Sequence, residues 1–376
     1  MKTLTILIVF AVSAFAESSV RSFTAEELVN LALSDNPELR FYEQQGTALP
    51  KPSDTRSPVI PQPLDFPSRE NFRRAVLNLD AELARFYLAE FRFALAGQVR
   101  LKAMEYQAAT ETSATASDLA SRISMLVRML EERPAAGVQA LIERRILEGT
   151  ALPFVRQASE ADVRTNLLRT ELNGLLGRDP NAELNVTGSF VLPRETQAKQ
   201  SSDSLLLKIR EAEIARGLAG LDAASGIESF AVGGWFTRDG LGASDALVGV
   251  TRPGATAGST FAQTRERLLE DARAKLARET AQRQAAVQAA RKVAEAISTK
   301  LIENLRAASD LAERQYRVGA LGVNLLVEAH REYLGALESR HEAVIQAWRN
   351  SLDLDLLTLP ASKSPSGKVI VDPKKQ

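Results

Sequence analysis

The sequence predicts a mainly α protein, built from long antiparallel coiled-coil hairpins in two unequal repeats with one short β-hairpin. Three observations predict this fold class. The stretch 259–318 contains no glycine or proline and is followed by Gly319. Apolar residues within it recur every three or four positions, which places them on one helix face. The order short helix, connector, long helix, glycine turn and return helix occurs twice along the chain.

The stretch 259–318 is too long to be buried within a compact domain. As one helix it would extend about 90 Å. Its apolar stripe contains several alanines, so a neighbouring helix can approach closely. We therefore expect a long barrel or bundle of coiled-coil helices. The stripe consists of Val287, Ala290, Ala294, Ile297, Leu301, Leu305, Ala308 and Ala312.

Composition excludes several classes of function. The chain of 376 residues carries 47 acidic and 47 basic residues, so its balanced charge does not favour nucleic acid as a partner. It has no cysteine, which excludes disulfides, thiol chemistry, cysteine metal sites and a lipid-modified cysteine. No Ser/His/Asp arrangement, phosphate loop or carboxylate pair in a predicted cleft is recognisable. We expect neither an enzyme nor a cofactor.

The first 16 residues have the pattern of a cleaved signal peptide. Lys2 precedes an apolar run over residues 4–12, and Ala14-Phe15-Ala16 follows as a small-x-small cleavage site. A membrane anchor or core helix is the competing interpretation, but the run has about half the length that a bilayer requires. We expect an exported protein that meets a membrane through strands or an amphipathic surface, because no other stretch is apolar enough to span one.

The first repeat is expected over residues 17–180. Thr24 and Glu27 have the spacing of a capping box, and Asn36-Pro37 interrupts and restarts the helix that they begin. Six prolines between residues 50 and 67 predict an extended connector in place of a clear β-hairpin. The remaining expected elements are a helix over about 68–133 broken at Gly97, a turn at 134–137, a helix over about 139–176 and a stop at Gly177-Arg178-Asp179-Pro180.

The second repeat is expected over residues 202–360, after a crossover linker at 181–201. A β-hairpin is predicted at about 227–250, where alternating residues flank a turn at Asp239-Gly240. The long helix, a turn at Gly319 and a return helix over about 323–357 follow. Residues 361–376 carry four lysines among Ser, Pro and Gly and are expected to be disordered.

Three motifs resemble the TolC-like outer-membrane efflux channel family. Asn36-Pro37-Glu38-Leu39 is similar to the Asn-Pro-x-Leu near the family's start. Leu175-Leu176-Gly177-Arg178-Asp179-Pro180 resembles the Leu-Leu-Gly-x-x-Pro that closes its first repeat. Tyr316-Arg317-Val318-Gly319, followed by the leucine-rich residues 325–329, is similar to its helix tip. The resemblance covers nearly all of the chain that follows residues 1–16.

The resemblance implies a homotrimer in which an α-barrel crosses the periplasm and continues as a β-barrel in the outer membrane. It also implies that the glycine tips dock onto a periplasmic adaptor (membrane fusion) protein of an inner-membrane pump, for export of small molecules or ions. The tips would consist of Arg133, Gly137 and Val138 in the first repeat and Arg317, Val318, Gly319 and Ala320 in the second.

The membrane-facing strand candidates are Phe230, Val232, Trp235 and Phe236. Trp235 fits either the membrane interface or packing against a helix end. With one clear hairpin per chain, a trimer would have six strands, whereas the family has twelve, so the barrel would be reduced. The alternative function is therefore a periplasmic helical scaffold or binding protein of this descent without a complete membrane barrel.

The remaining candidates have simple structural interpretations. His330 and His341 are about 16 Å apart on one helix face, so they cannot share a metal ion within one chain, and we expect solvated helix surface there. Tyr316 is expected to be a packing residue rather than an adaptor contact. The charged residues of 265–283 are expected to be a solvated outer face, with salt bridges between protomers as the alternative.

Overall fold

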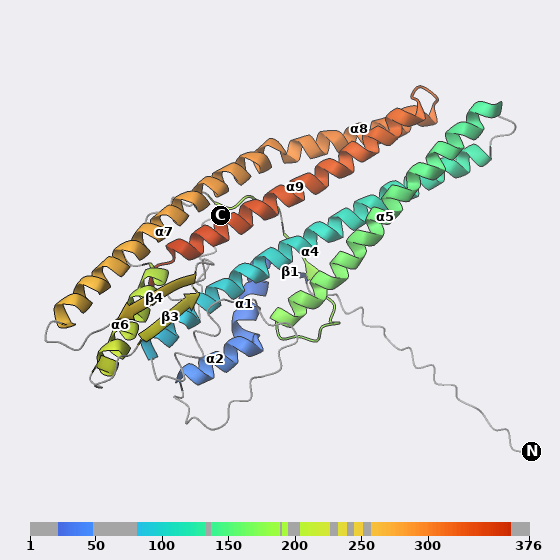
Figure 1. Ribbon diagram of the computed structural model, residues 1–376. Helices are drawn as coiled ribbons and strands as arrows, with labels where there is room; N and C mark the ends of the chain where they lie inside the picture. Colours follow the sequence, from blue (N-terminus) through green and yellow to red (C-terminus); the bar gives the residue numbers. More distant parts are fainter. Residues whose placement is uncertain are drawn as a thin grey trace, which may run out of the picture.

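The computed structural model describes residues 22–47, 81–132, 137–188, 190–194, 204–225, 232–238, 244–250 and 257–361. This part of the chain forms an elongated layer of two long helical hairpins that lie side by side (Figure 1). The predicted fold class, mainly α with long hairpins, is confirmed. Several predicted segments lie outside the described residues, among them the signal peptide at 1–16, the proline-rich segment 50–67, the Asp239-Gly240 turn and the tail after residue 361.

The helices follow a fixed order across the layer. α4 (Ala81–Glu131) and α5 (Gly137–Leu175) form the first hairpin. In the second, α7 (Ala257–Ala296) and α8 (Thr299–Arg317) run antiparallel to α9 (Val323–Thr358). α4 and α9 make the main contact between the hairpins, so α5 forms one outer edge and α7 with α8 forms the other.

Two short helices pack on the half of α4 that lies far from the hairpin tips. α1 (Ala25–Asp35) begins at the predicted capping box: the Glu27 N–H donates to Thr24 Oγ1 at 3.3 Å, and the Thr24 N–H donates to Glu27 Oε2 at 2.8 Å. α2 (Pro37–Thr47) begins one residue after Asn36, whose Oδ1 accepts the N–H of Leu39 at 2.9 Å. Local sequence therefore determines both helix starts.

The Asn36 side chain also joins this region to the end of α5. Its Nδ2 donates to the carbonyl oxygen of Leu175 at 2.8 Å. Gly177, with φ +66°, ends α5 in the left-handed conformation, and a Cβ there would lie 2.7 Å from the Asp35 carbonyl oxygen. Two of the motifs that carry the family resemblance therefore meet in space.

The strands form two small sheets. β1 (Ser22–Phe23) pairs in parallel with β2 (Asn185–Val186). β3 (Val232–Arg238) pairs antiparallel with β4 (Ser244–Val250), with Trp235 opposite Leu247. Together with α6 (Leu205–Ser225), this hairpin lies at the end of the molecule opposite the Gly319 turn (Figure 1).

The predicted break at Gly97 is wrong, because α4 continues through this residue. A Cβ at Gly97 would meet Leu352 Cδ1 of α9 at 3.6 Å. This is an ordinary van der Waals distance, so α4 packs directly against α9 here and the packing does not require glycine. Contacts on both sides of α4 outweigh a helix penalty of about 1 kcal/mol for glycine.

The single helix predicted over 259–318 is also wrong, since α7 ends at Ala296 and α8 begins at Thr299. Ser298 is extended (φ −68°, ψ 154°), and its side chain accepts the N–H of Leu301 as an N-cap at 3.2 Å. The break moves the buried stripe by one residue, so Leu301 is exposed and Ile302 is buried. Arg340 of α9 donates to the Ile297 carbonyl oxygen at 2.5 Å.

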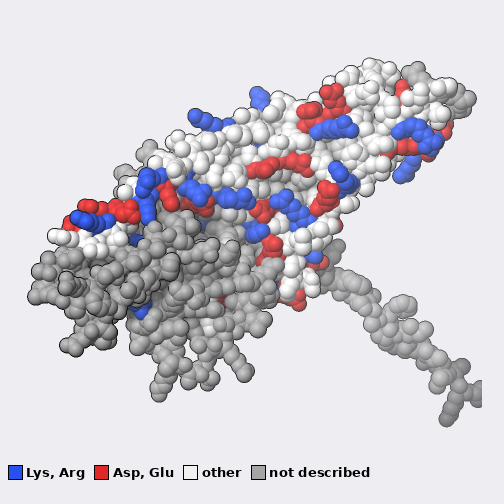
Figure 2. All heavy atoms as spheres, in the orientation of Figure 1, with Lys and Arg blue, Asp and Glu red and all other residues white. Residues whose placement is uncertain are grey.

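Where the face in Figure 2 is not grey, basic and acidic side chains intersperse along the helices. Most charged residues of 265–283 are exposed, as expected for a solvated face. Some pair within the chain, such as Arg283 with Asp353 at 3.1 Å. None of the helices in the described ranges is both long and apolar enough to cross a bilayer.

Candidate functional site

The turn of the second hairpin is shaped by Gly319. α8 ends in a Schellman motif: the Gly319 N–H donates to the Tyr316 carbonyl oxygen, and the Ala320 N–H donates to that of Gln315, both at 2.9 Å. Gly319 has φ +78°, a conformation that side chains disfavour. The chain then enters α9 at Val323, so the two helices are joined by a short, defined tip.

The tips of both hairpins carry exposed aliphatic side chains, and a buried aromatic residue lies beneath the tip of the second. Val318 is 75 % exposed and Val138, in the first turn of α5, is 73 % exposed, whereas Tyr316 is only 6 % exposed. The Tyr316 hydroxyl lies 3.5 Å from Glu143 Oε2 of α5. The predicted packing role of Tyr316 is therefore confirmed.

The other predicted tip and strand residues are placed as follows. Arg317, Gly319 and Ala320 are exposed. Gly137 is the first residue of α5, and Arg133 lies outside the described ranges. Val232, Trp235 and Phe236 belong to β3, and Phe230 lies outside the described ranges.

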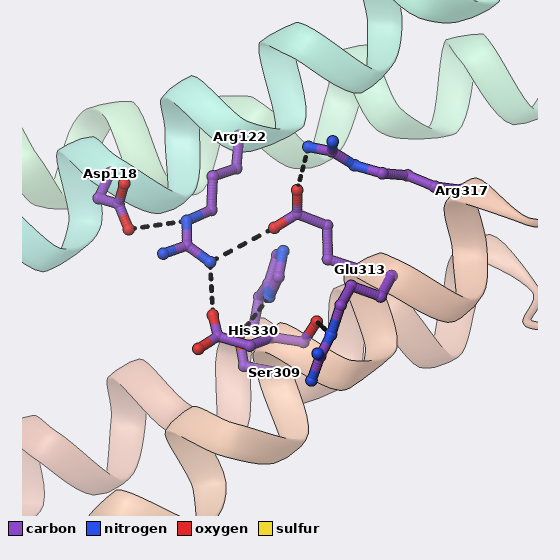
Figure 3. Close-up of polar contacts among 8 residues, drawn as sticks. Asp118, Arg122, Ser309, Glu313, Arg317 and His330 are labelled. Carbon is purple, nitrogen blue, oxygen red and sulfur yellow. Dashed lines mark hydrogen bonds and ion pairs between the residues drawn. The ribbon is translucent and has the colours of Figure 1, made fainter.

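Beneath the tips, a group of charged residues links the two hairpins; we call it the Arg122 network (Figure 3). Arg122 of α4 contacts Asp118 Oδ2 at 2.8 Å, Asp310 Oδ1 at 2.5 Å and Glu313 Oε2 at 3.3 Å. Arg317 contacts the other oxygen of Glu313 at 2.5 Å. Burial lowers the pKa of Arg122, but hydrogen bonds to Asp310 and Asp118 outweigh burial and raise that pKa above its ordinary value.

Both histidines are buried, so the prediction that they lie on solvated helix surface is wrong. His330 is 0 % exposed and His341 is 5 % exposed. His330 Nδ1 lies 2.7 Å from Ser309 Oγ, and His341 Nε2 lies 3.0 Å from Glu111 Oε2. The His341 ring also stacks on Phe190, with centroids 4.7 Å apart. The physical reason is that α9 lies between α4 and α7–α8, so this face meets helices rather than water.

The sequence contains a signal that could have identified these buried histidines. They continue a buried stripe on α9 that repeats every three or four residues. This stripe consists of Val323, Leu326, His330, Leu334, Leu337, His341 and Val344. Nothing comparable indicates a metal site, since the described ranges contain no group of three or more His, Asp or Glu that could hold an ion.

Helix α5 is apolar on two opposite faces. With 3.6 residues per turn, its buried and its exposed aliphatic residues lie on opposite sides of the helix axis. The inner face packs within the layer through Leu147, Phe154, Ala158, Ala161, Leu168 and Leu172. The other face, here called the α5 edge, consists of the exposed residues Val138, Leu141, Ile142, Leu152, Val155, Val163 and Leu167.

The opposite edge of the layer also exposes aliphatic residues. Val293 of α7 and Leu301 and Leu311 of α8 are exposed, and we call them the α7–α8 edge. The two edges belong to different helices at opposite sides of one layer. Such a layer can extend from one copy of the chain to the next, because each edge lacks a helix to cover it within the described chain.

These features define an elongated layer of helical hairpins with two apolar edges, a short β-hairpin at one end and the Gly319 turn at the other. Several solved outer-membrane channels have a similar fold. MtrE of Neisseria gonorrhoeae is 16 % identical, with a TM-score of 0.57 over 89 % of this chain and 88 % of that one. CmeC of Campylobacter jejuni is 13 % identical, with a TM-score of 0.60 over 89 % and 85 %.

The outer-membrane channel OprN is 16 % identical, with a TM-score of 0.55 over 89 % of each chain. The chain therefore has the TolC-like fold of outer-membrane channels, as its motifs predicted. No protein-family profile matches the sequence. No curated protein matches it.

Proposed function

We propose that this protein is an outer-membrane efflux channel component, which exports small molecules or ions across the periplasm and the outer membrane. The observation that carries the proposal is the one-layer arrangement of the hairpins with an apolar face at each edge. The shared fold with solved outer-membrane channels supports it. The proposed channel is a trimer in the outer membrane that acts together with a periplasmic adaptor and an inner-membrane pump.

The two edges support a ring of several copies. Because they belong to different helices, a contact between them is heterologous, and heterologous contacts generate closed rings when the rotation between copies closes. A closed ring of helices would surround a tunnel along the hairpins. We take the number of copies, three, from the resemblance to the channel family.

The free energy of burial, compared with the cost of association, favours an interface along the full length of both edges. Burial of a large aliphatic side chain contributes about 1.5–3 kcal/mol, and the seven residues of the α5 edge are already partly covered. Their burial then yields on the order of 5–10 kcal/mol. Association costs about 4–15 kcal/mol, so a contact restricted to the tip residues would be too weak and the whole edge is needed.

The two ends of the layer suit two different partners in this proposal. The tip residues Arg133, Gly137, Val138, Arg317, Val318, Gly319 and Ala320 would dock onto a periplasmic adaptor linked to an inner-membrane pump. Exposed aliphatic groups on a glycine-shaped turn allow close approach of a partner helix. At the far end, the β3–β4 hairpin with Phe230, Val232, Trp235 and Phe236 would enter the outer membrane, after export directed by residues 1–16.

An oligomer assay with edge variants tests the proposal. We expect the purified chain to be trimeric by native mass spectrometry, and we expect Val163→Glu and Leu167→Glu to release monomers. Arg164→Glu is the control, since Arg164 is exposed beside the α5 edge rather than within it. A monomer in the unaltered chain would contradict the ring.

Membrane fractionation and conductance test the location and the channel separately. Extraction from outer membranes only by detergent, with conductance in planar bilayers, is the expected result. A water-soluble periplasmic protein without conductance would instead support the alternative, a helical scaffold or binding protein without a complete membrane barrel.

A further inference from the structure

The His330 side chain has one ring nitrogen without a hydrogen-bond partner among the described residues. The residue is completely buried. Its Nδ1 pairs with the Ser309 hydroxyl of α8 at 2.7 Å, while Nε2 is buried and has no partner. Figure 3 shows the ring between α9 and the Arg122 network. The neutral imidazole already leaves one polar atom unsatisfied, and protonation would add a charge and a second N–H that has no acceptor.

The charged groups that face His330 come from two neighbouring helices. They are Asp118 and Arg122 of α4 and Asp310 and Glu313 of α8. α5 contributes the Phe154 ring, edge-on with centroids 6.5 Å apart, and no charge. The carboxylates are already bound to Arg122, and Glu313 is bound to Arg317 as well. None of them hydrogen-bonds to the imidazole.

Burial lowers the pKa of His330 below its ordinary value of 6.5, and Glu313 only partly offsets that effect while Arg122 adds to it. Below pH 6.5 an opened tip binds more protons than the closed one. The closed arrangement therefore loses stability as the pH falls from about 6.5 through the lowered pKa.

The break between α7 and α8 allows the tip half to move separately. Ser298 is extended, so the helix is interrupted between Ala296 and Thr299. Beyond the break, Arg122 holds α8 to α4, and the Ser309–His330 pair lies between α8 and α9. Motion of α8 about this break would expose His330 while α7 stays packed on α9.

We propose that the α8–α9 tip is an acid-sensitive element, in which a solvent proton taken up by buried His330 loosens α8 from α9 about the break at Ile297–Ser298. Protonated imidazole donates from both nitrogens, and Nε2 finds an acceptor only when water enters. Opening therefore hydrates a charge that the closed tip leaves unpaired. The proposal concerns the tip itself and holds whether or not the tip docks onto an adaptor.

His341 provides an internal contrast. It lies eleven residues further along the same stripe and is also buried. Its Nε2, however, faces the Glu111 carboxylate at 3.0 Å, so a protonated His341 keeps a charged partner. Mild acid should therefore leave the contact between α9 and α4 at His341 closed.

Hydrogen–deuterium exchange of the full purified chain tests the proposal between pH 7.5 and pH 5.0, with rates normalised for intrinsic exchange. We expect tip segments within 299–334 to exchange several-fold faster at pH 5.0, and segments within 340–358 to be unchanged. His330→Gln should remove the response, and His341→Gln should retain it. A tip without a pH response, or an equal response in His330→Gln, would overturn the proposal.

Histidine NMR provides a second measurement that needs no folded His330 variant. The chain has two histidines, so ¹³C-labelled histidine yields two signals, and His341→Gln assigns them. We expect the His330 signal to titrate below pH 6.5, over the same range as the change in tip exchange. Titration at or above 6.5, or titration without a change in exchange, would contradict the proposal.

Discussion

The Asn36 side-chain amide donates a 2.8 Å hydrogen bond to the carbonyl oxygen of Leu175, 139 residues along the chain. This contact satisfies a carbonyl at the end of α5 while the other side of the same amide caps α2. Gly177 lies beside it, with φ +66° and with no room for a Cβ next to the Asp35 carbonyl. The Asn36-Pro37 motif and the Gly177 motif at the end of α5 therefore form one contact, here called the Asn36–Gly177 contact.

We expect Gly177→Ala at the Asn36–Gly177 contact to destabilise the protein by at least about 2 kcal/mol, because it adds both a left-handed alanine and a backbone clash. Gly174→Ala is the matched control: Gly174 lies within α5, and its Cβ would meet nothing within 4 Å. That control should be neutral or stabilise by about 0.5–1 kcal/mol. Urea unfolding measures the stability of both variants. Equal effects would contradict a specific role of the Asn36–Gly177 contact.

Gly319→Leu should disrupt the tip and leave helix content intact. A Cβ at Gly319 meets nothing within 4 Å, so the cost of about 1–2 kcal/mol arises from φ +78° alone. Gly322→Leu is the control, since Gly322 also has open space around its Cβ but a φ of −79°. Far-UV circular dichroism reports helix content, and adaptor binding or transport reports the tip. Unaffected binding in Gly319→Leu would argue against docking through this tip.

Arg122→Gln should weaken the connection between the hairpins by about 1–2 kcal/mol, because it leaves Asp310 and the buried Glu313 with less positive charge. The effect is moderate since Arg122 is partly exposed. Arg156→Gln is the control: its pair with Glu160 lies within α5 and both side chains are exposed, so the loss should stay below about 0.5 kcal/mol.

A double-mutant cycle of Arg122→Gln with Glu313→Gln separates this contact from general damage to the helix. The two changes should be less than additive in the free energy of unfolding, since both remove the same ion pair. Strict additivity would show that the residues are not coupled.

Glu111→Gln should change the pH dependence of stability in acid. The hydrogen bond with His341 lowers the pKa of Glu111 below its ordinary value of 4.5, although burial opposes this. A lowered carboxyl pKa contributes stability that is complete above 4.5 and is lost as the pH falls through the folded-state pKa. The stability difference between the two chains should therefore be constant from about pH 7 to pH 5 and shrink below about pH 4.5.

Urea unfolding at each pH measures that difference. His330→Gln serves as the comparison. Its effect on stability should change with pH below pH 6.5, and the hydrogen-bond partner of His330 is the Ser309 hydroxyl rather than a carboxylate. A difference for Glu111→Gln that is unchanged down to pH 3 would show that the carboxyl contact does not contribute.

Much of the fold followed from patterns within single segments. The capping box at Thr24 and Glu27, the Gly319 turn and the long return helix depend on neighbours a few residues away, so local rules predict them. The repeated order of these elements predicted hairpins, and the structure confirms them. The exposed α5 edge was missed, because a helix that is apolar on two sides has no clear periodic signal.

Contacts between distant segments account for the differences. Gly97 stays helical because Leu352 packs over it, and the histidines are buried because α9 lies between two other helices. The break at Ser298 shifts a stripe that the sequence alone continues smoothly through Leu301. Helix identity and turn positions thus arise from short-range chemistry. Burial, charge pairing and the polar contacts around His330 arise from long-range packing, because a single segment does not specify which face its neighbours cover.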